Sequence, residues 1–150
     1  SGRGDVWRDF GKHSLQMRLA GSDEQLFGVL NGVMPVSSFV GSSAPACAIY
    51  ATGGVYSPGV TLVNAPPVPF LVTDVPVFHV DFDAGKAWVS KNGAFASGGN
   101  PETGVNPTWT FTPNTAFWAG ATPVDGVATN TLPADASELL YALPAGYSAW

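Results

Sequence analysis

The chain has 150 residues, of which 45% are hydrophobic and only 11% are charged. This composition excludes a disordered chain, and the length is that of a single domain with its own core. The net charge is −5, and four of the six cations, Arg3, Arg8, Lys12 and Arg18, lie near the N-terminus. No basic surface remains elsewhere, so a nucleic-acid partner is not expected.

The first element, residues 1–12, is rich in glycine and charge, and it predicts a flexible N-terminal arm. Residues 13–150 are expected to form one folded domain. No stretch reaches the 18 or more apolar residues that a membrane-spanning helix requires, so no membrane insertion is expected. The single Cys47 lies in the apolar run PACAIYA and is expected to be buried.

Short apolar or alternating runs, separated by Gly, Pro, Asn and Ser, follow along the chain. They predict strands over 13–20, 24–31, 46–51, 60–64, 69–73, 77–83, 86–91, 108–112, 116–121, 127–131 and 139–143. One helical turn is expected over 135–139. Many short strands of this kind indicate an all-β sandwich or barrel.

The most regular pattern is HVDFDAGKAWVSKNG, residues 79–93. Five apolar side chains in and beside it fall on one face and are expected in the core: Phe78, Val80, Phe82, Ala87 and Val89. A two-residue turn at Ala84-Gly85 would pair Phe82 with Ala87. Asn92-Gly93 suits a type I′ turn, because both residues tolerate positive φ.

Asp81 and Asp83 alternate on the other face, close enough for a pair of catalytic carboxylates. Aspartates at a strand end beside a turn glycine such as Gly85 more often accept hydrogen bonds from the turn, so a scaffold role is expected. His13 and His79, the only histidines, have no cysteine near them. The sequence therefore predicts no metal, no cofactor and no enzymatic activity.

Aromatic residues gather in the second half of the chain. Alternation sends Trp109 and Phe111 to the core and Trp88 to the outer side. Phe117 and Trp118 are adjacent, so one of them faces outward. Trp88 and Trp118 are therefore candidates for an exposed aromatic contact surface.

Residues 75–95, VPVFHVDFDAGKAWVSKNGAF, resemble the central signature of SPRY domains. Residues 97–109, SGGNPETGVNPTW, are similar to a loop of SPRY-like modules in bacterial and bacteriophage structural proteins, and the ending 139–150 resembles their terminal segment. Ala87 and Val89 depart from this pattern, since larger core residues are usual there. The resemblance implies a SPRY-like sandwich of two antiparallel sheets, in a family that binds partners through loops.

Three functions follow as hypotheses. The first is a non-enzymatic accessory protein on the surface of a phage virion, as a capsid decoration or tail fibre component, contacting other virion proteins or copies of itself. Its contacts would use Trp88 and Trp118, with Arg3, Arg8 and Lys12 as an anchor. The second is a module at a tail tip that binds a host glycan or receptor. The third is an intracellular SPRY adaptor that binds a peptide, or an unrecognised hydrolase.

Overall fold

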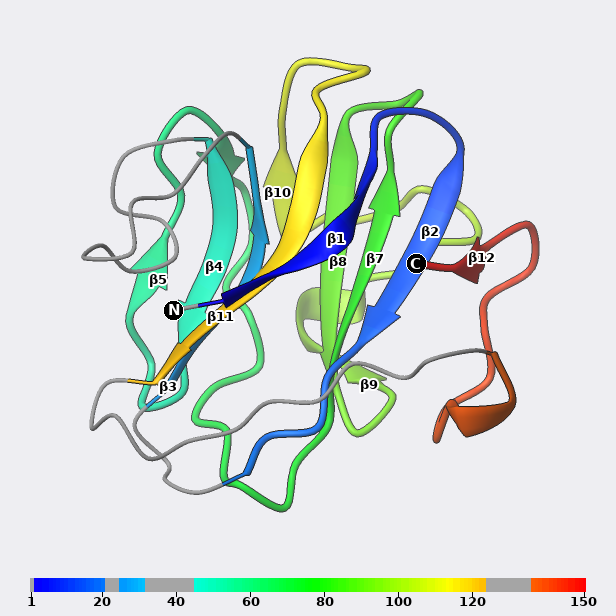
Figure 1. Ribbon diagram of the computed structural model, residues 1–150. Coiled ribbons are helices and arrows are strands. Elements are labelled where there is room, and N and C mark those ends of the chain that lie inside the picture. The colour runs from blue at the N-terminus through cyan, green and yellow to red at the C-terminus, as the bar shows by residue number, and fades with distance from the viewer. Residues whose placement is uncertain (1, 21–24, 32–44, 124–135) are drawn as a thin grey trace.

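The computed structural model describes residues 2–20, 25–31, 45–123 and 136–150, and its regular secondary structure is almost entirely β-strand (Figure 1). The first sheet has the order β1 (Gly2–Arg8), β11 (Phe117–Pro123), β3 (Gln25–Leu30), β4 (Ala46–Tyr50) and β5 (Val55–Tyr56). The second has the order β12 (Ser148–Ala149), β2 (Lys12–Gln16), β7 (Pro76–Asp81), β8 (Lys86–Lys91), β10 (Trp109–Thr110) and β6 (Thr61–Leu62), and β9 (Ala94–Phe95) pairs with β8. The two sheets face each other as layers, and the predicted all-β sandwich is confirmed.

Neighbouring strands are antiparallel in the described residues, apart from the parallel pair β12 and β2. Two 3-10 turns occur, Ala96–Gly98 and Ala136–Glu138, and the second lies within the predicted helical turn. Among the described residues, none of the helical segments has the length and hydrophobicity needed to span a bilayer.

Some predicted strands are absent. Residues 69–73 and 139–143 form no strand. Within residues 69–73, only Phe70 is buried, while Leu71 is exposed. Residues 139–143 form hydrogen bonds with the side chain of Gln16 in β2 instead of pairing with a strand. The strand expected over 127–131 lies outside the described residues.

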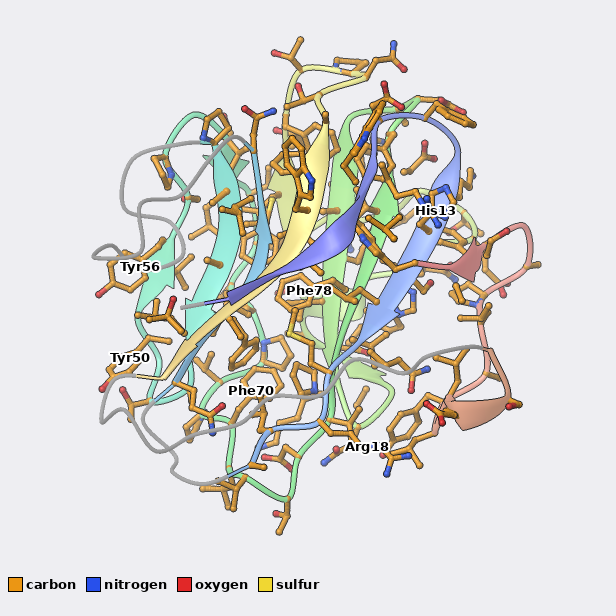
Figure 2. The ribbon with its side chains drawn as sticks, viewed as in Figure 1. His13, Arg18, Tyr50, Tyr56, Phe70 and Phe78 are labelled. Atoms are coloured by element: carbon orange, nitrogen blue, oxygen red, sulfur yellow. The ribbon has the colours of Figure 1, made fainter. Side chains whose placement is uncertain are left out.

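The core lies between the two sheets and is mainly aromatic. Phe78 of β7 stacks on Trp109 at a centroid distance of 6.0 Å, and Phe27 of β3 meets Phe78 edge-on at 6.2 Å. Figure 2 shows Phe78 in the interior between the layers. Every core residue predicted from 78–89 is buried there, because one face of β7 and β8 packs on the opposing sheet.

The turn between β7 and β8 is longer than predicted. Asp81 pairs with Lys86, so the loop has four residues, Phe82 to Gly85, and the expected pairing of Phe82 with Ala87 is wrong. Phe82 is instead a core residue within the loop, packed against the aromatic rings around it. The register moves by two positions, which leaves every side chain on its predicted face.

Gly85 is required at the end of this loop. Its φ is +63°, and a Cβ there would collide with the carbonyl oxygen of Phe111. The next turn is as predicted: Lys91 pairs with Ala94, which leaves Asn92 and Gly93 as a two-residue loop with φ of 52° and 79°.

The N-terminal segment differs from the predicted arm. Gly2–Arg8 pairs with β11 as the edge strand of the first sheet, with an irregularity between Arg3 and Trp7. The sequence signal is weak, because Val6 and Trp7 are the only apolar residues of this strand. The pairing nevertheless fixes the segment against the sandwich.

Candidate interaction surface at the β1–β2 corner

The chain crosses from the first sheet to the second between β1 and β2, at the blue turn at the top of Figure 1. Gly11 lies in this turn with a φ of +73°. Its N–H donates to Asp83 Oδ1 at 3.0 Å, and its carbonyl accepts from the N–H of Phe82 at 3.0 Å. The β7–β8 loop therefore holds the turn in place.

This turn and the strand end before it form a groove of about 400 Å³. We call it the N-terminal corner groove, and its lining residues are Val6, Trp7, Arg8, Asp9, Phe10 and His13.

Large apolar side chains stand exposed around the groove. Phe10 is 70% exposed, and Trp7 is 49% exposed. Trp7 pairs with Trp118 across β1 and β11, and their rings lie 6.5 Å apart at 48°. Trp118 is half-buried, whereas its neighbour Phe117 is in the core, so one of the two faces outward as the alternation predicts. Exposed aromatic clusters of this kind are typical of binding surfaces.

Two of the residues that line the groove have a buried polar atom without a partner. Arg8 Nε and Asp9 Oδ1 are both buried, and neither has a hydrogen-bond partner among the described residues. Such atoms lower stability unless a ligand or water satisfies them.

His13 forms the side of the groove on β2, and Figure 2 shows it beside the turn. Its ring lies 6.2 Å from Phe82 and 6.4 Å from Trp150, and its Nδ1 lies 3.4 Å from the carbonyl oxygen of Ala149. Burial lowers the pKa of His13, with a further contribution from the charge of Arg8. These contacts pack His13 against Phe82 and the C-terminal residues.

Trp88 is not part of a surface. It lies on the outer side of the second sheet as predicted, but it is fully buried, so the expected exposure is wrong. Its Nε1 donates to the carbonyl of Val105 at 2.9 Å, since the segment after β9 folds back over this side of the sheet. Alternation assigns a residue to a face, but it does not reveal that a distant segment covers that face.

The other predicted contact residues fall in different places. Arg8 and Trp118 lie at the corner. Lys12 is paired with Asp81, with Nζ 3.2 Å from Oδ2, and its Nζ lies 5.7 Å from the ring centre of Tyr147. The side chain of Arg3 lies outside the described residues. Trp7 and Phe10 were not among the predicted contact residues, although both are large apolar residues in a segment that was interpreted as an arm.

The two aspartates bind backbone groups. Asp81 Oδ1 accepts from the N–H of Ala84 at 2.9 Å, inside its own turn. Asp83 accepts from Gly11 in the neighbouring turn rather than from its own. Among the described residues, no group of three or more His, Cys, Asp or Glu side chains is placed to hold a metal ion.

A buried Ser–His pair lies on the outer face of the second sheet, beneath the segments that cover this face. Ser14 Oγ is 2.7 Å from His79 Nδ1, and the His79 ring packs against Phe95 and Tyr147 at 5.3 Å and 5.8 Å. Burial lowers the pKa of His79 to about 4. Ser14 and His79 are both buried, and the His79 ring contacts two of the residues that cover this face.

The C-terminal segment is attached to the same face by Gln16. Its Oε1 accepts from the N–H groups of Leu140 and Tyr141 at 2.9 Å and 3.2 Å, and its Nε2 donates to the Tyr141 carbonyl at 2.6 Å. A second groove of about 350 Å³ lies between this segment and the loop that covers Trp88, with Pro101 and Pro144 among its lining residues.

Comparison with known proteins places the fold. No family model matches the chain, and no curated protein matches it. Among solved structures, the crystal structure of the SPRY domain of human HERC1 is similar, with a TM-score of 0.58 at 12% sequence identity. The match covers 87% of this chain and 79% of that one. The fold is SPRY-like. At 12% sequence identity, the similarity to the HERC1 domain shows the fold alone.

Proposed function

We propose that this SPRY-like domain is a non-enzymatic interaction module that binds a partner protein through the N-terminal corner groove. The exposed pair Trp7 and Phe10, next to Trp118 and Arg8, is the observation on which the proposal rests. Tryptophan, phenylalanine and arginine are enriched in protein interfaces and supply much of their binding energy.

The remaining surface of the second sheet is less suited to this role. Trp88 and His79 are buried under the covering segments, and Lys12 is paired with Asp81. Asp81 and Asp83 accept hydrogen bonds from turn N–H groups, which is a scaffold arrangement. The acidic chain, with a net charge of −5, also favours a protein partner over a nucleic acid.

The more specific proposal is that the partner belongs to a virus particle, so that the domain is an accessory component on the virion surface, bound to another virion protein or to a second copy. It is supported by the resemblance of residues 97–109 to loops of phage structural proteins. Mass spectrometry of purified particles tests it, and absence of the chain from them would contradict it.

Site-specific photocrosslinking tests the general proposal. A photoreactive phenylalanine analogue is placed at Phe10, and in a control protein at Leu140, which is also exposed, at 54%. In the native source, crosslinking from position 10 to one defined protein, without the same adduct from position 140, is the expected result. The same adduct from both positions, or from position 140 alone, would contradict the proposal.

A further inference from the structure

We infer that a second copy of this chain packs on an apolar strip at an uncharged side of the sandwich, with the strips of the two copies facing each other. The strip consists of four large apolar side chains that are between 38% and 51% exposed: Leu62, Val63, Val68 and Leu71. Exposed apolar side chains that gather in one segment are typical of interaction surfaces. The strip shares no residue with the N-terminal corner groove, so the inference does not rest on the proposed function.

The strip belongs to a long stretch of the chain that carries no charge. None of the six cations, the eleven acidic residues or the two histidines lies in residues 25–73. The described part of this stretch contains β5 and β6, which are the last strands of their sheets. Residues 57–60 connect these two strands directly, so both sheets end on this side of the sandwich. Figure 2 shows Tyr50 and Tyr56, of β4 and β5, across the molecule from His13.

Backbone hydrogen bonds attach both parts of the strip to the sandwich. The N–H of Val63 donates to the carbonyl of Thr108 at 2.8 Å, next to the pairing of β6 with β10. The N–H of Phe70 donates to the carbonyl of Ala51 at 2.7 Å, and the Phe70 ring lies in the core, 5.2 Å from Phe27. A backbone that is already bonded in this way lowers the cost of ordering the strip in a contact.

One ion pair borders the strip. Lys91 Nζ donates to the carbonyl of Pro69 at 2.7 Å and lies 2.9 Å from Asp74 Oδ2. Asp74 Oδ2 also accepts from the N–H of Leu71 at 2.9 Å. Because the two side chains pair with each other, they add no net charge at the border of the strip.

The distribution of charge favours a second copy as the occupant. Each chain carries a net charge of −5, so two copies repel each other wherever their charged surfaces approach. In a two-fold contact both copies use the same surface, and a side chain near the axis meets its own counterpart. A charged residue there would face a like charge, whereas Leu62 and Val63 meet apolar side chains. A charged partner of another kind would find no opposite charge on the strip to pair with.

Analytical ultracentrifugation of the full 150-residue chain over a series of concentrations tests the inference. The native protein should form a dimer with a dissociation constant below about 1 mM. Added salt should strengthen the dimer, because it screens the repulsion between two acidic copies. Val63→Lys and Val63→Glu should each weaken it at least tenfold. The control Val105→Lys makes the same change in net charge at a side chain that is 48% exposed outside the strip, and it should leave the dimer unchanged.

A mixture of Val63→Lys with Val63→Glu tests whether the two strips face each other. It should associate more tightly than either variant alone, because opposite charges then meet across the contact. Leu71→Lys and Leu71→Glu replace this pair if either variant does not fold. The inference is overturned if the native chain stays monomeric, if Val105→Lys weakens the dimer as much as Val63→Lys, or if the mixture gains nothing. Each of these results leaves the proposed function standing, since crosslinking from position 10 is measured separately.

Discussion

At the scale of single residues, His79 makes the stability of the fold depend on pH. Its pKa is about 4 in the folded chain, because the ring is buried between Ser14, Phe95 and Tyr147. An unfolded chain has the ordinary histidine value of about 6.5. Above that value the histidine is neutral in both states, and its contribution to stability is complete.

We predict that the free energy of unfolding falls as pH decreases from about 6.5 to 4, since only the unfolded chain takes up the proton in this window. The full shift corresponds to roughly 3 kcal/mol. Urea unfolding at a series of pH values measures it. His79→Gln keeps an acceptor for Ser14 and should remove most of this pH dependence; an unchanged slope in that variant would assign the effect to other groups.

Asp81 illustrates a carboxylate with a structural role. Asp81→Asn retains an oxygen for the N–H of Ala84 and loses the ion pair with the partly exposed Lys12. We predict a loss of at most about 1 kcal/mol in the free energy of unfolding, with partner binding unchanged. Urea unfolding and a binding assay measure the two quantities, and a loss of binding at full stability would show that the aspartate is functional.

At the scale of elements, one side chain of β2 binds the start of the C-terminal segment. Gln16 is buried and makes three hydrogen bonds to the backbone of Leu140 and Tyr141. We predict that Gln16→Leu costs roughly 2 to 4 kcal/mol, because these backbone groups lose their partner. Hydrogen exchange at the Leu140 and Tyr141 amides should accelerate more than exchange in β7 and β8, whereas equal protection in both proteins would show that the segment is held by other contacts.

The β7–β8 loop depends on Gly85 in a similar way. Gly85→Ala adds a Cβ at a φ of +63°, directly against the Phe111 carbonyl. We predict a loss of more than about 1 kcal/mol, measured by thermal unfolding. Ala84→Gly is the matched control, since Ala84 is exposed in the same loop. A smaller loss in Gly85→Ala than in the control would contradict this view of the loop.

Alternation predicted which side chains of β7 and β8 face the opposing sheet. It did not predict that other segments bury the outer face of these strands as well. Phe78, Val80 and Val89 follow the period of two because the opposing sheet covers only one side of β7 and β8. The same pattern gave the wrong turn length, since registers that differ by two residues leave the faces unchanged. Trp88 was misjudged because a loop distant in sequence covers it.

The candidate site was only partly visible in the sequence. Trp118 and Arg8 were recognised as contact candidates, but their neighbours in space were not. Trp7 reaches Trp118 only through the pairing of β1 with β11, and this contact joins segments that are far apart in the sequence. Local patterns in a short strand with few apolar residues do not predict such a pairing.

At the scale of the whole molecule, the outer side of the second sheet differs from the corner between β1 and β2. The outer side of the second sheet is filled by Trp88, His79 and the segments that cover them. The N-terminal corner groove instead exposes large aromatic rings. This asymmetry is the reason to place binding at the corner.

Hydrogen exchange of the SPRY-like domain, free and in complex with the partner captured from position 10, tests this central claim most directly. The account predicts new protection over residues 6–13 and 117–118, with little change over 99–102 and 142–144, which line the second groove. Protection confined to the second groove, with none at residues 6–13, would contradict it.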